Sequence, residues 1–427
     1  MKQRVRRPVR TLRTVLLTLT TTAAVGAGTL TASAAPYGAT ADTAYGTSTH
    51  GKSAYGTGAG QARRGGHEAT LAALRQVVGS GELPGVIAKV HDARGAWSGA
   101  VGLSDTATGR PRLTGEHFRA ASNTKMFIGT VMLQLEAEGR LSTEDTVEKW
   151  LPGLVRGNGY DGHKITLRQL LSHTSGLPDY TGDEAFHVKT SGSGFPEHRY
   201  DTYRPQDLVA VALKMAPPKA NPAYSNTNYV LAGLVIEKAT GHTYAQEATR
   251  RIIEPLKLTG TSFPGTDPRM PAPHPVAYSR LHSKDPDAPV HDATEQNMTW
   301  LGAAGEIIST ADDLNRFQHA LMRGRLLPPA QLDKMLDGAP AGGGGAYGLG
   351  VDSLKLSCGV TVYGHTGRTN GSLSATTGTK DGSHRLTFQI NGDWLTNSSV
   401  YYDIIEAEFC GKAPGTGGNA GTGKFAD

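Results

Sequence analysis

Apolar and polar residues alternate with a period of two in two separate regions of the chain. Residues 86–91 and 97–103 alternate near the N-terminal end, and four further segments do so late in the sequence, at 346–351, 360–365, 372–377 and 385–391. A period of two is typical of a β-strand with one buried face. Because short turns separate these segments, we expect the strands to pair in an antiparallel sheet.

Between the two regions, apolar residues recur at the three- and four-residue spacing of an amphipathic helix. Helices are expected at residues 67–78, 126–138, 205–215, 229–239, 243–256 and 400–409. Another begins after Thr310, which is a suitable N-cap followed by Asp312 and Asp313 in the first turn. Its apolar face comprises Leu314, Phe317, Leu321 and Met322.

Strands at both ends with helices between them predict an α/β fold of the α+β type. One antiparallel sheet built from both chain ends would be flanked by helices, with an all-helical lobe beside it. The sheet lobe would comprise about residues 66–120 and 300–411, and the helical lobe about residues 121–299. We expect the functional site where the two lobes meet.

The two ends of the chain differ in composition from residues 66–411. Residues 1–34 combine a basic start, an apolar Thr-rich stretch and the small-residue site Ala32-Ser33-Ala34, which is the pattern of a secretory signal peptide. A membrane-anchoring helix is the alternative, although a span needs about 20 mostly apolar residues. Residues 35–65 and 412–427 are rich in Gly, Ala and Thr, which predicts a disordered linker and tail. We therefore expect a secreted, extracellular protein of the cell-wall space, monomeric and without a stable membrane span.

The basic pI of about 9.0 largely reflects the first 34 residues. They hold six of the 43 Lys and Arg residues and no acidic residue, which leaves 37 basic against 38 acidic residues. No later stretch combines clustered Lys or Arg with aromatic residues. We therefore expect no nucleic-acid partner.

Cys358 and Cys410 are the only two cysteines. In an exported protein an even pair suggests a disulfide, and two buried free thiols are the alternative. Two cysteines make a poor metal site, and His67-Glu68 lacks the second histidine of a His-Glu-x-x-His motif. The sequence therefore predicts no catalytic metal and no cofactor.

Ser122 and Lys125 are spaced so that their side chains can meet across one helical turn. Ser122 would lie at a helix N-terminus, where free N–H groups favour negative charge. A desolvated lysine can act as the base that activates a serine nucleophile. A solvated helix start is the alternative for this pair taken alone.

Four other residues attract attention. Tyr224 follows a proline-rich loop, and a neighbouring cation such as Lys125 could lower the pKa of its phenol and make it a proton shuttle. Asn226 offers a planar amide to a peptide-like substrate, or it is a helix N-cap. His173 invites a catalytic interpretation, but a turn histidine more often binds backbone. Trp300 is either a pocket wall or part of the core.

Three motifs in order, Ser122-x-x-Lys125, Tyr224-Ser225-Asn226 and His365-Thr366-Gly367, resemble those of penicillin-binding proteins and serine β-lactamases. The Tyr-Ser-Asn form and the run LLSHTSGL at residues 170–177 look like the class C β-lactamase branch. Histidine at the start of the third motif looks like the secreted D-alanyl-D-alanine carboxypeptidases of that branch. The similarity extends from about residue 67 to residue 410, nearly all of the expected folded part.

This resemblance implies a serine carboxypeptidase or transpeptidase that acts on peptidoglycan stem peptides and is acylated by β-lactams. Ser122 would attack the carbonyl between two D-alanines, Lys125 would take its proton, and Tyr224 would pass a proton to the leaving nitrogen. The oxyanion would bind the N–H groups of Ser122 and Arg368. His365 would act as a donor beside Tyr224. The substrate-binding residues would be Asn226, Thr366, Gly367, Arg368 and Trp300.

One departure from the family pattern concerns the substrate carboxylate. The segment before the third motif offers one lysine, Lys355, and an acid, Asp352, where a basic cluster is expected. We hypothesise that Arg368 contacts the carboxylate instead. A β-lactamase, a D-aminopeptidase or an esterase on the same scaffold is the first alternative function. A catalytically silent binding protein of the same fold is the second.

Overall fold

The computed structural model describes residues 66–79, 83–219, 222–342, 345–394 and 400–412. The expected signal peptide and linker, and all but the first residue of the expected tail, lie outside these residues and stay predictions.

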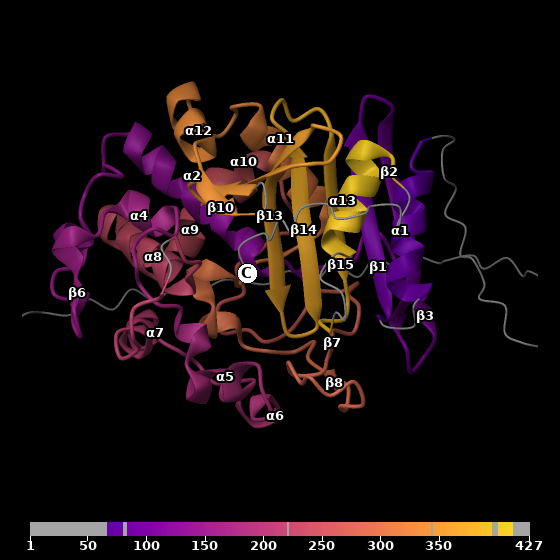
Figure 1. Cartoon of the computed structure of the whole chain (residues 1–427), viewed down its shortest axis with the longest axis horizontal. Coiled ribbons are helices and arrows are strands. Elements are labelled where there is room, and N and C mark those ends of the chain that lie inside the picture. The colour runs from indigo at the N-terminus through magenta and orange to yellow at the C-terminus, as the bar shows by residue number, and fades with distance from the viewer. Residues whose placement is uncertain (1–65, 80–82, 220–221, 343–344, 395–399, 413–427) are drawn as a thin grey trace, which may run out of the picture. The chain divides into compact units, whose positions relative to one another are not determined.

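A nine-stranded antiparallel sheet is the centre of the fold (Figure 1). Its order is β10-β11-β12-β13-β14-β15-β1-β2-β3, so the strands from the two ends of the chain meet where β15 pairs with β1. The strands are β1 (Gly85–Asp92), β2 (Gly95–Asp105), β3 (Arg110–Pro111), β10 (Ala339–Gly342), β11 (Gly345–Tyr347), β12 (Asp352–Lys355), β13 (Thr361–Thr369), β14 (Ser372–Thr379) and β15 (Arg385–Ile390). The expected fold class and the sheet built from both chain ends are therefore confirmed.

Helices cover both faces of this sheet. The helices are α1 (Glu68–Gly79), α2 (Thr124–Ala137), α3 (Val147–Trp150), α4 (Leu167–Leu171), α5 (Glu184–Thr190), α6 (Phe195–His198), α7 (Pro205–Ala212), α8 (Asn226–Thr240), α9 (Tyr244–Ala248), α10 (Glu254–Leu256), α11 (Ala311–Met322), α12 (Pro329–Leu336) and α13 (Val400–Cys410). Helices α1 and α13, from opposite ends of the described chain, lie side by side on one face of the sheet (Figure 1). Helix α11 packs on the strands β1, β14 and β15, and α2 to α10 form the helical region beside the sheet.

The period-two pattern of β1 explains its place between two cores. Val86, Ala88 and Val90 join the apolar cluster beneath α1 and α13, whereas Ile87 joins the larger cluster around α2 and α8. Successive side chains of a strand point to opposite faces, so one strand contributes to both cores. No helix of the described residues is long and apolar enough to cross a membrane.

Helix α11 begins as its sequence predicts. The Thr310 side chain accepts a hydrogen bond from the Asp313 N–H, and the expected apolar face is buried. Helix α2 differs, because most of its residues are buried on every side. A helix buried all round lies inside the molecule, and α2 runs through the middle of the larger core.

Three short antiparallel strand pairs lie outside the main sheet. The pairs are β4 (Phe118–Arg119) with β9 (Ile308–Ser309), β5 (Arg156–Gly157) with β6 (Tyr160–Asp161), and β7 (Tyr278–Ser279) with β8 (His291–Asp292). The predicted strand at 346–351 is wrong after Tyr347, because β11 ends there and β12 begins only at Asp352. Between them, Gly350 has a φ of 95°, and a Cβ at Gly348 would lie 2.0 Å from the Met335 carbonyl oxygen. The chain bends there because it passes closely over α12.

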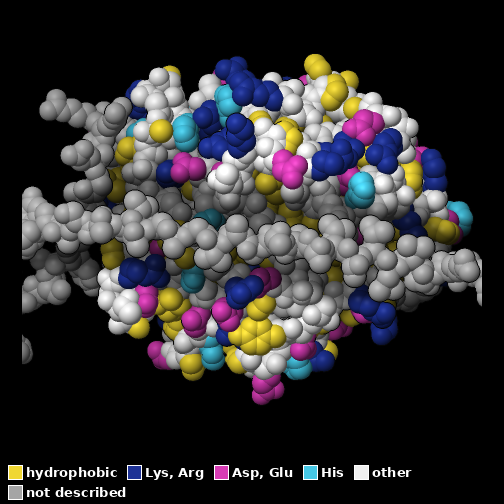
Figure 2. Space-filling model, turned by 180° about the vertical axis from the view of Figure 1, so that it is seen from behind, with side chains coloured by type: hydrophobic (Ala, Val, Ile, Leu, Met, Phe, Trp, Pro, Cys, Tyr) yellow, Lys and Arg dark blue, Asp and Glu magenta, His cyan; other side chains and the backbone are white. Residues whose placement is uncertain are grey.

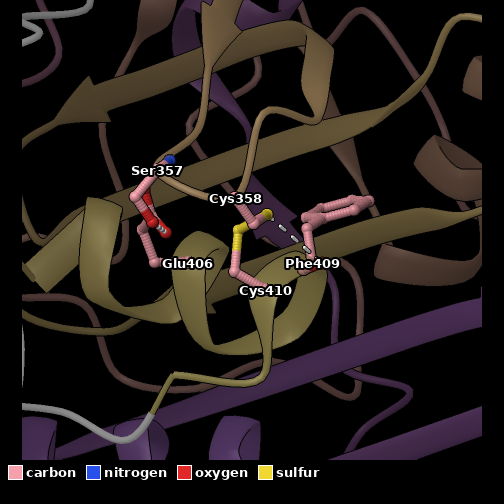
Figure 3. The surroundings of a disulfide bond; sticks show 5 residues. All are labelled: Ser357, Cys358, Glu406, Phe409 and Cys410. Carbon is pink, nitrogen blue, oxygen red and sulfur yellow. Dashed lines mark hydrogen bonds between the residues drawn. A yellow bond between two sulfur atoms is a disulfide. The ribbon is translucent and has the colours of Figure 1, made fainter.

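Cys358 and Cys410 form a disulfide with a Cα–Cα distance of 5.6 Å (Figure 3). It joins the turn between β12 and β13 to the last residue of α13, and Ser357 beside it hydrogen-bonds to Glu406 of the same helix. Of the two alternatives left by the sequence, the disulfide is therefore confirmed.

Figure 2 shows the face opposite to that in Figure 1. Lys and Arg side chains lie there in several groups, with Asp, Glu and apolar side chains between them. The expectation that the protein has no nucleic-acid partner stays a prediction.

Replacing both cysteines by alanine is expected to lower the free energy of unfolding by about 2–4 kcal/mol, because the disulfide closes a loop of 52 residues in the unfolded chain. Urea denaturation of the double variant and of the oxidised wild type measures the difference. Equal midpoints and equal slopes would show that the disulfide does not stabilise this fold.

Candidate active site

Ser122 lies in a single 3-10 turn, Ala121–Asn123, between β4 and α2. The preceding residue, Ala121, has a φ of 49°, a left-handed conformation that costs about 1–3 kcal/mol in a residue with a Cβ. The turn is held by Asn123, whose amide donates to the Ala120 carbonyl (2.8 Å) and to Ser374 Oγ (3.0 Å). The predicted place of Ser122 at the entrance to a helix is confirmed.

Strand β13 runs directly past this turn. A Cβ at Gly367 would lie 2.1 Å from the Ala120 carbonyl oxygen and 2.8 Å from Ser374 Oγ. Only glycine allows such an approach between β13 and the nucleophile turn. The structure therefore explains the glycine of the His365-Thr366-Gly367 motif by packing, and its role in substrate binding stays a prediction.

The Lys125 amine lies one helical turn after Ser122 and is buried. Its Nζ is 2.9 Å from Ser122 Oγ, 2.8 Å from Asn226 Oδ1 and 2.7 Å from the Ala304 carbonyl oxygen. No carboxylate of the described residues forms an ion pair with Lys125. The predicted meeting of serine and lysine is confirmed.

Burial lowers the pKa of Lys125 from 10.5 to about 7, and the more distant Asp179 and Asp352 oppose this shift only partly. A neutral amine has two N–H donors and one lone pair. The two carbonyl oxygens of Asn226 and Ala304 take the two donors, so the lone pair faces Ser122 Oγ. This arrangement orients Lys125 as the base for Ser122.

Tyr224 completes the group around the serine. Its ring lies under the Lys125 amine, 4.8 Å from Nζ to the ring centroid, and its hydroxyl hydrogen-bonds with Ser122. The expectation that Lys125 lowers the pKa of this phenol is wrong. Burial raises the pKa of Tyr224 well above 10, and the hydrogen bond with Ser122 offsets only part of the rise. The phenol is therefore a neutral hydrogen-bond donor that can pass a proton on, not a phenolate.

The His173 ring packs against the Tyr224 ring. The two rings have a centroid distance of 4.2 Å and a tilt of 37°, and His173 Nδ1 accepts from the Ser225 N–H and from the Asn228 amide. Burial lowers its pKa well below 6.5, so the ring is neutral. The predicted contact of His173 with backbone is therefore confirmed.

Asn226 opens α8, but the helix cap is not its role, because Ser225 occupies the N-cap position. Its Oδ1 accepts from Lys125, and its Nδ2 donates to Asp179 Oδ2 at 2.8 Å. Both ends of the amide are therefore engaged by protein groups. Asn226 therefore positions Lys125, and its predicted contact with the substrate stays a prediction.

The geometry around His365 differs from the expected donor role. Its Nδ1 contacts the Thr366 carbonyl oxygen, which can only accept, so this nitrogen carries the hydrogen. Its Nε2 therefore accepts from the Tyr347 hydroxyl at 3.0 Å. Burial, with help from Lys125, lowers the pKa of His365 to about 3. A neutral ring whose centroid is 6.3 Å from that of Tyr224 is not a charged donor to the phenol.

A cavity of about 270 Å³ opens above Ser122. All the expected substrate-binding residues line it, and so do Ser122, Tyr224 and His365. The further lining residues are Asp179, Thr181, His187, Ser191, His282, Leu301 and Thr369. Arg368 lies exposed at the rim, with its guanidinium 3.4 Å from the Asp393 carbonyl oxygen. The site therefore lies where the sheet, through β13, meets the helical region.

The sequence did not point to two residues of this site. Asp179 is a buried carboxyl whose pKa is raised by burial, and it holds Asn226 in place. The Tyr347 hydroxyl hydrogen-bonds to Nε2 of His365. The position of Asp179 two residues after the LLSHTSGL run was the available signal, whereas nothing around Tyr347 distinguishes it from a core tyrosine.

The arrangement can perform acyl transfer. A nucleophile, a neutral base and a proton-carrying phenol meet at the floor of one cavity.

Comparison with known proteins agrees with this chemistry. The family model named Beta-lactamase matches residues 71–388. A solved D-stereospecific amidohydrolase from Streptomyces sp. is 49% identical, with a TM-score of 0.76 over 82% of this chain and 100% of that chain. A D-amino acid amidase from Ochrobactrum anthropi SV3 is 26% identical, with a TM-score of 0.67 over 79% of this chain and 97% of that one.

A putative penicillin-binding protein from Bacillus subtilis is 29% identical over 233 residues, which are 55% of this chain and 52% of that protein. The chain thus spans about half the length of the curated relatives it matches. The family match covers well over half of the chain and includes the Ser122 turn and the His365 strand. The chain belongs to the β-lactamase family, the serine hydrolases whose fold is shared with penicillin-binding proteins and D-amino acid amidases.

Proposed function

We propose that the protein hydrolyses the amide bond on the carboxyl side of a D-amino acid through an acyl-enzyme on Ser122. The observation that carries this proposal is the three-group contact of Ser122 Oγ, the neutral Lys125 amine and the Tyr224 phenol at the floor of a cavity. The similarity to a D-stereospecific amidohydrolase over that protein's full length supports the choice of substrate.

In the first half of the reaction, Ser122 Oγ attacks the amide carbonyl carbon and its proton moves to Lys125 Nζ. The C–N bond then breaks, and the leaving nitrogen takes a proton through the Tyr224 hydroxyl. The products of this half are an ester on Ser122 and a free amine. The N–H groups of Ser122 and Arg368 would bind the oxyanion, because Gly367 lets β13 approach the serine turn.

In the second half, water attacks the ester carbonyl and gives up a proton to the same base. The Ser122–acyl bond breaks, the free acid leaves and Ser122 regains its hydroxyl hydrogen. An amine in place of water would give acyl transfer. We also propose that β-lactams acylate Ser122, and that the protein acts after export, as the pattern of residues 1–34 predicts.

Hydrolysis of D-phenylalanine p-nitroanilide against its L-enantiomer tests the proposal. The D-form is expected to react at least about tenfold faster, and Ser122→Ala is expected to lower kcat by a thousandfold or more, to about the level left by nucleophile removal in other serine hydrolases. Ser191→Ala is the matched control, because Ser191 lines the same cavity and its side chain forms no hydrogen bond with Ser122, Lys125 or Tyr224. Equal rates for both enantiomers, or full activity of Ser122→Ala, would refute the proposal.

The pH dependence of kcat/KM is expected to follow Lys125. Its amine is a base only when neutral, so activity is present above a pKa of about 7 and falls about tenfold per pH unit below it. The pKa of His365 is lowered to about 3, so the titration of this residue does not contribute to the fall in activity below pH 7. A kinetic profile that stays flat from pH 8 down to about pH 5 would exclude a neutral lysine as the base.

Arg368 favours a second candidate, the D-alanyl-D-alanine carboxypeptidase expected from the motif resemblance. It is an exposed guanidinium at the cavity rim, it contacts the Asp393 carbonyl oxygen and the His282 ring, and it forms no ion pair with a carboxylate of the described residues. A guanidinium in this state can pair with a substrate carboxylate. The amidase does not require such a contact.

Peptides ending in D-Ala-D-Ala with a free or an amidated C-terminus distinguish the two candidates. For a carboxypeptidase, Arg368→Gln is expected to raise KM for the free acid about tenfold and leave the amidated peptide unaffected. Arg325→Gln, an exposed arginine outside the cavity, is the control. The carboxypeptidase is excluded by a preference for the amidated peptide in the wild type, or by an Arg368→Gln variant with unchanged kinetics.

A further inference from the structure

A second cavity, of about 310 Å³, lies in the helical region behind the active site. The segment from Thr299 to Glu306 separates the two cavities. Trp300 and Leu301 line the active-site cavity, whereas Gly302 and Ala303 line the second one. The two cavities share no lining residue among the described residues. The volume falls within the range of small-molecule sites.

The walls of this cavity are mostly apolar and aromatic. Leu208 of α7 and Leu234 of α8 supply aliphatic surface, and Tyr203, Tyr244 and Phe263 supply rings. The Tyr244 and Phe263 rings meet edge to face at 6.0 Å. Aromatic faces attract cations as well as apolar groups.

Glu306 brings a buried carboxylate to this cavity. It is 1% exposed, and its two oxygens accept from the Tyr244 hydroxyl at 2.7 Å and from the Gly265 N–H at 3.2 Å. Within the described residues it forms no ion pair with a lysine, arginine or histidine. Burial raises the pKa of Glu306, and Arg119 opposes this only through space. A cation bound directly to the buried carboxylate would offset the cost of its charge.

Two other residues that line the cavity carry polar groups without a hydrogen-bond partner among the described residues. The Glu237 carboxylate is half-buried in the cavity wall, and no hydrogen bond or ion pair joins it to another described residue. The Tyr203 hydroxyl oxygen is buried and also has no hydrogen-bond partner. Because buried polar groups are normally paired, the Tyr203 hydroxyl indicates a missing partner, and the half-buried Glu237 carboxylate adds an acceptor at the cavity wall. No Lys, Arg or His is among the described residues that line the cavity.

We propose that this cavity is a binding site for a protonated amine that carries an aromatic or branched aliphatic group. The ammonium would donate to Glu306 and to the unpaired acceptors Glu237 and Tyr203. The apolar part would lie against Leu208, Leu234 and Phe263. The site is distinct from the one that holds Ser122, and the proposal does not depend on the reaction catalysed there.

The test uses 2-phenylethylamine as the probe and 3-phenylpropionate, of similar shape and opposite charge, as the control ligand. Isothermal titration calorimetry of the full chain near neutral pH is expected to show binding of the amine and none of the acid. Ala245→Trp, which fills the cavity from α9, is expected to abolish binding. Ala210→Trp, at an exposed position of α7 outside the cavity, is the matched control and should bind as the wild type does.

Charge is tested separately by Glu306→Gln, which should weaken binding of the amine about tenfold or more. Circular dichroism of each variant shows whether it folds. If Glu306→Gln does not fold, Glu237→Gln, at the less buried position, gives the same test of charge. The proposal is overturned if the wild type binds no amine at millimolar concentration, if the acid binds equally well, or if Ala245→Trp leaves the affinity unchanged. Unchanged affinity in both glutamine variants would also overturn it.

Discussion

The Lys125 amine is buried where three distant segments of the chain meet. Its contacts are Ser122 in the turn before α2, Asn226 at the start of α8 and the Ala304 carbonyl in the segment after Trp300. None of them is a carboxylate, so burial is not offset by an ion pair and the neutral amine is favoured. The nucleophile turn, the helical region and the segment that separates the two cavities must all be in place to hold this one group.

The residues around the Lys125 amine keep it neutral and hydrogen-bonded. Asp179, the nearest acid to influence it, reaches Lys125 through the Asn226 amide and is itself raised in pKa by burial. The rings of Tyr224, His173 and Tyr347 pack against one another beside it. Both histidines of this region are uncharged, so a proton that leaves Ser122 has Lys125 and Tyr224 as its carriers.

Local patterns in the sequence predicted most of the fold. Alternation located the long strands β1, β2, β13, β14 and β15 but missed β3, β10 and β12. The Thr310 cap located α11, and the serine–lysine spacing located the nucleophile. The failures have a common cause in tertiary packing. The bend at Gly348 to Gly350 depends on close passage over α12. The raised pKa of Tyr224, the neutral ring of His365 and the role of Asp179 depend on burial, which no short segment encodes.

The account depends most on the protonation state of Lys125, and an NMR titration of its Cε carbon measures that directly. The protein would be labelled with ¹³C-lysine, and the signal of Lys125 would be assigned by its loss in Lys125→Arg. The structure predicts a titration midpoint near 7 for this lysine, while exposed lysines remain protonated to about 10.5. A midpoint of Lys125 near 10.5 would mean a charged amine at neutral pH and would contradict its role as the base.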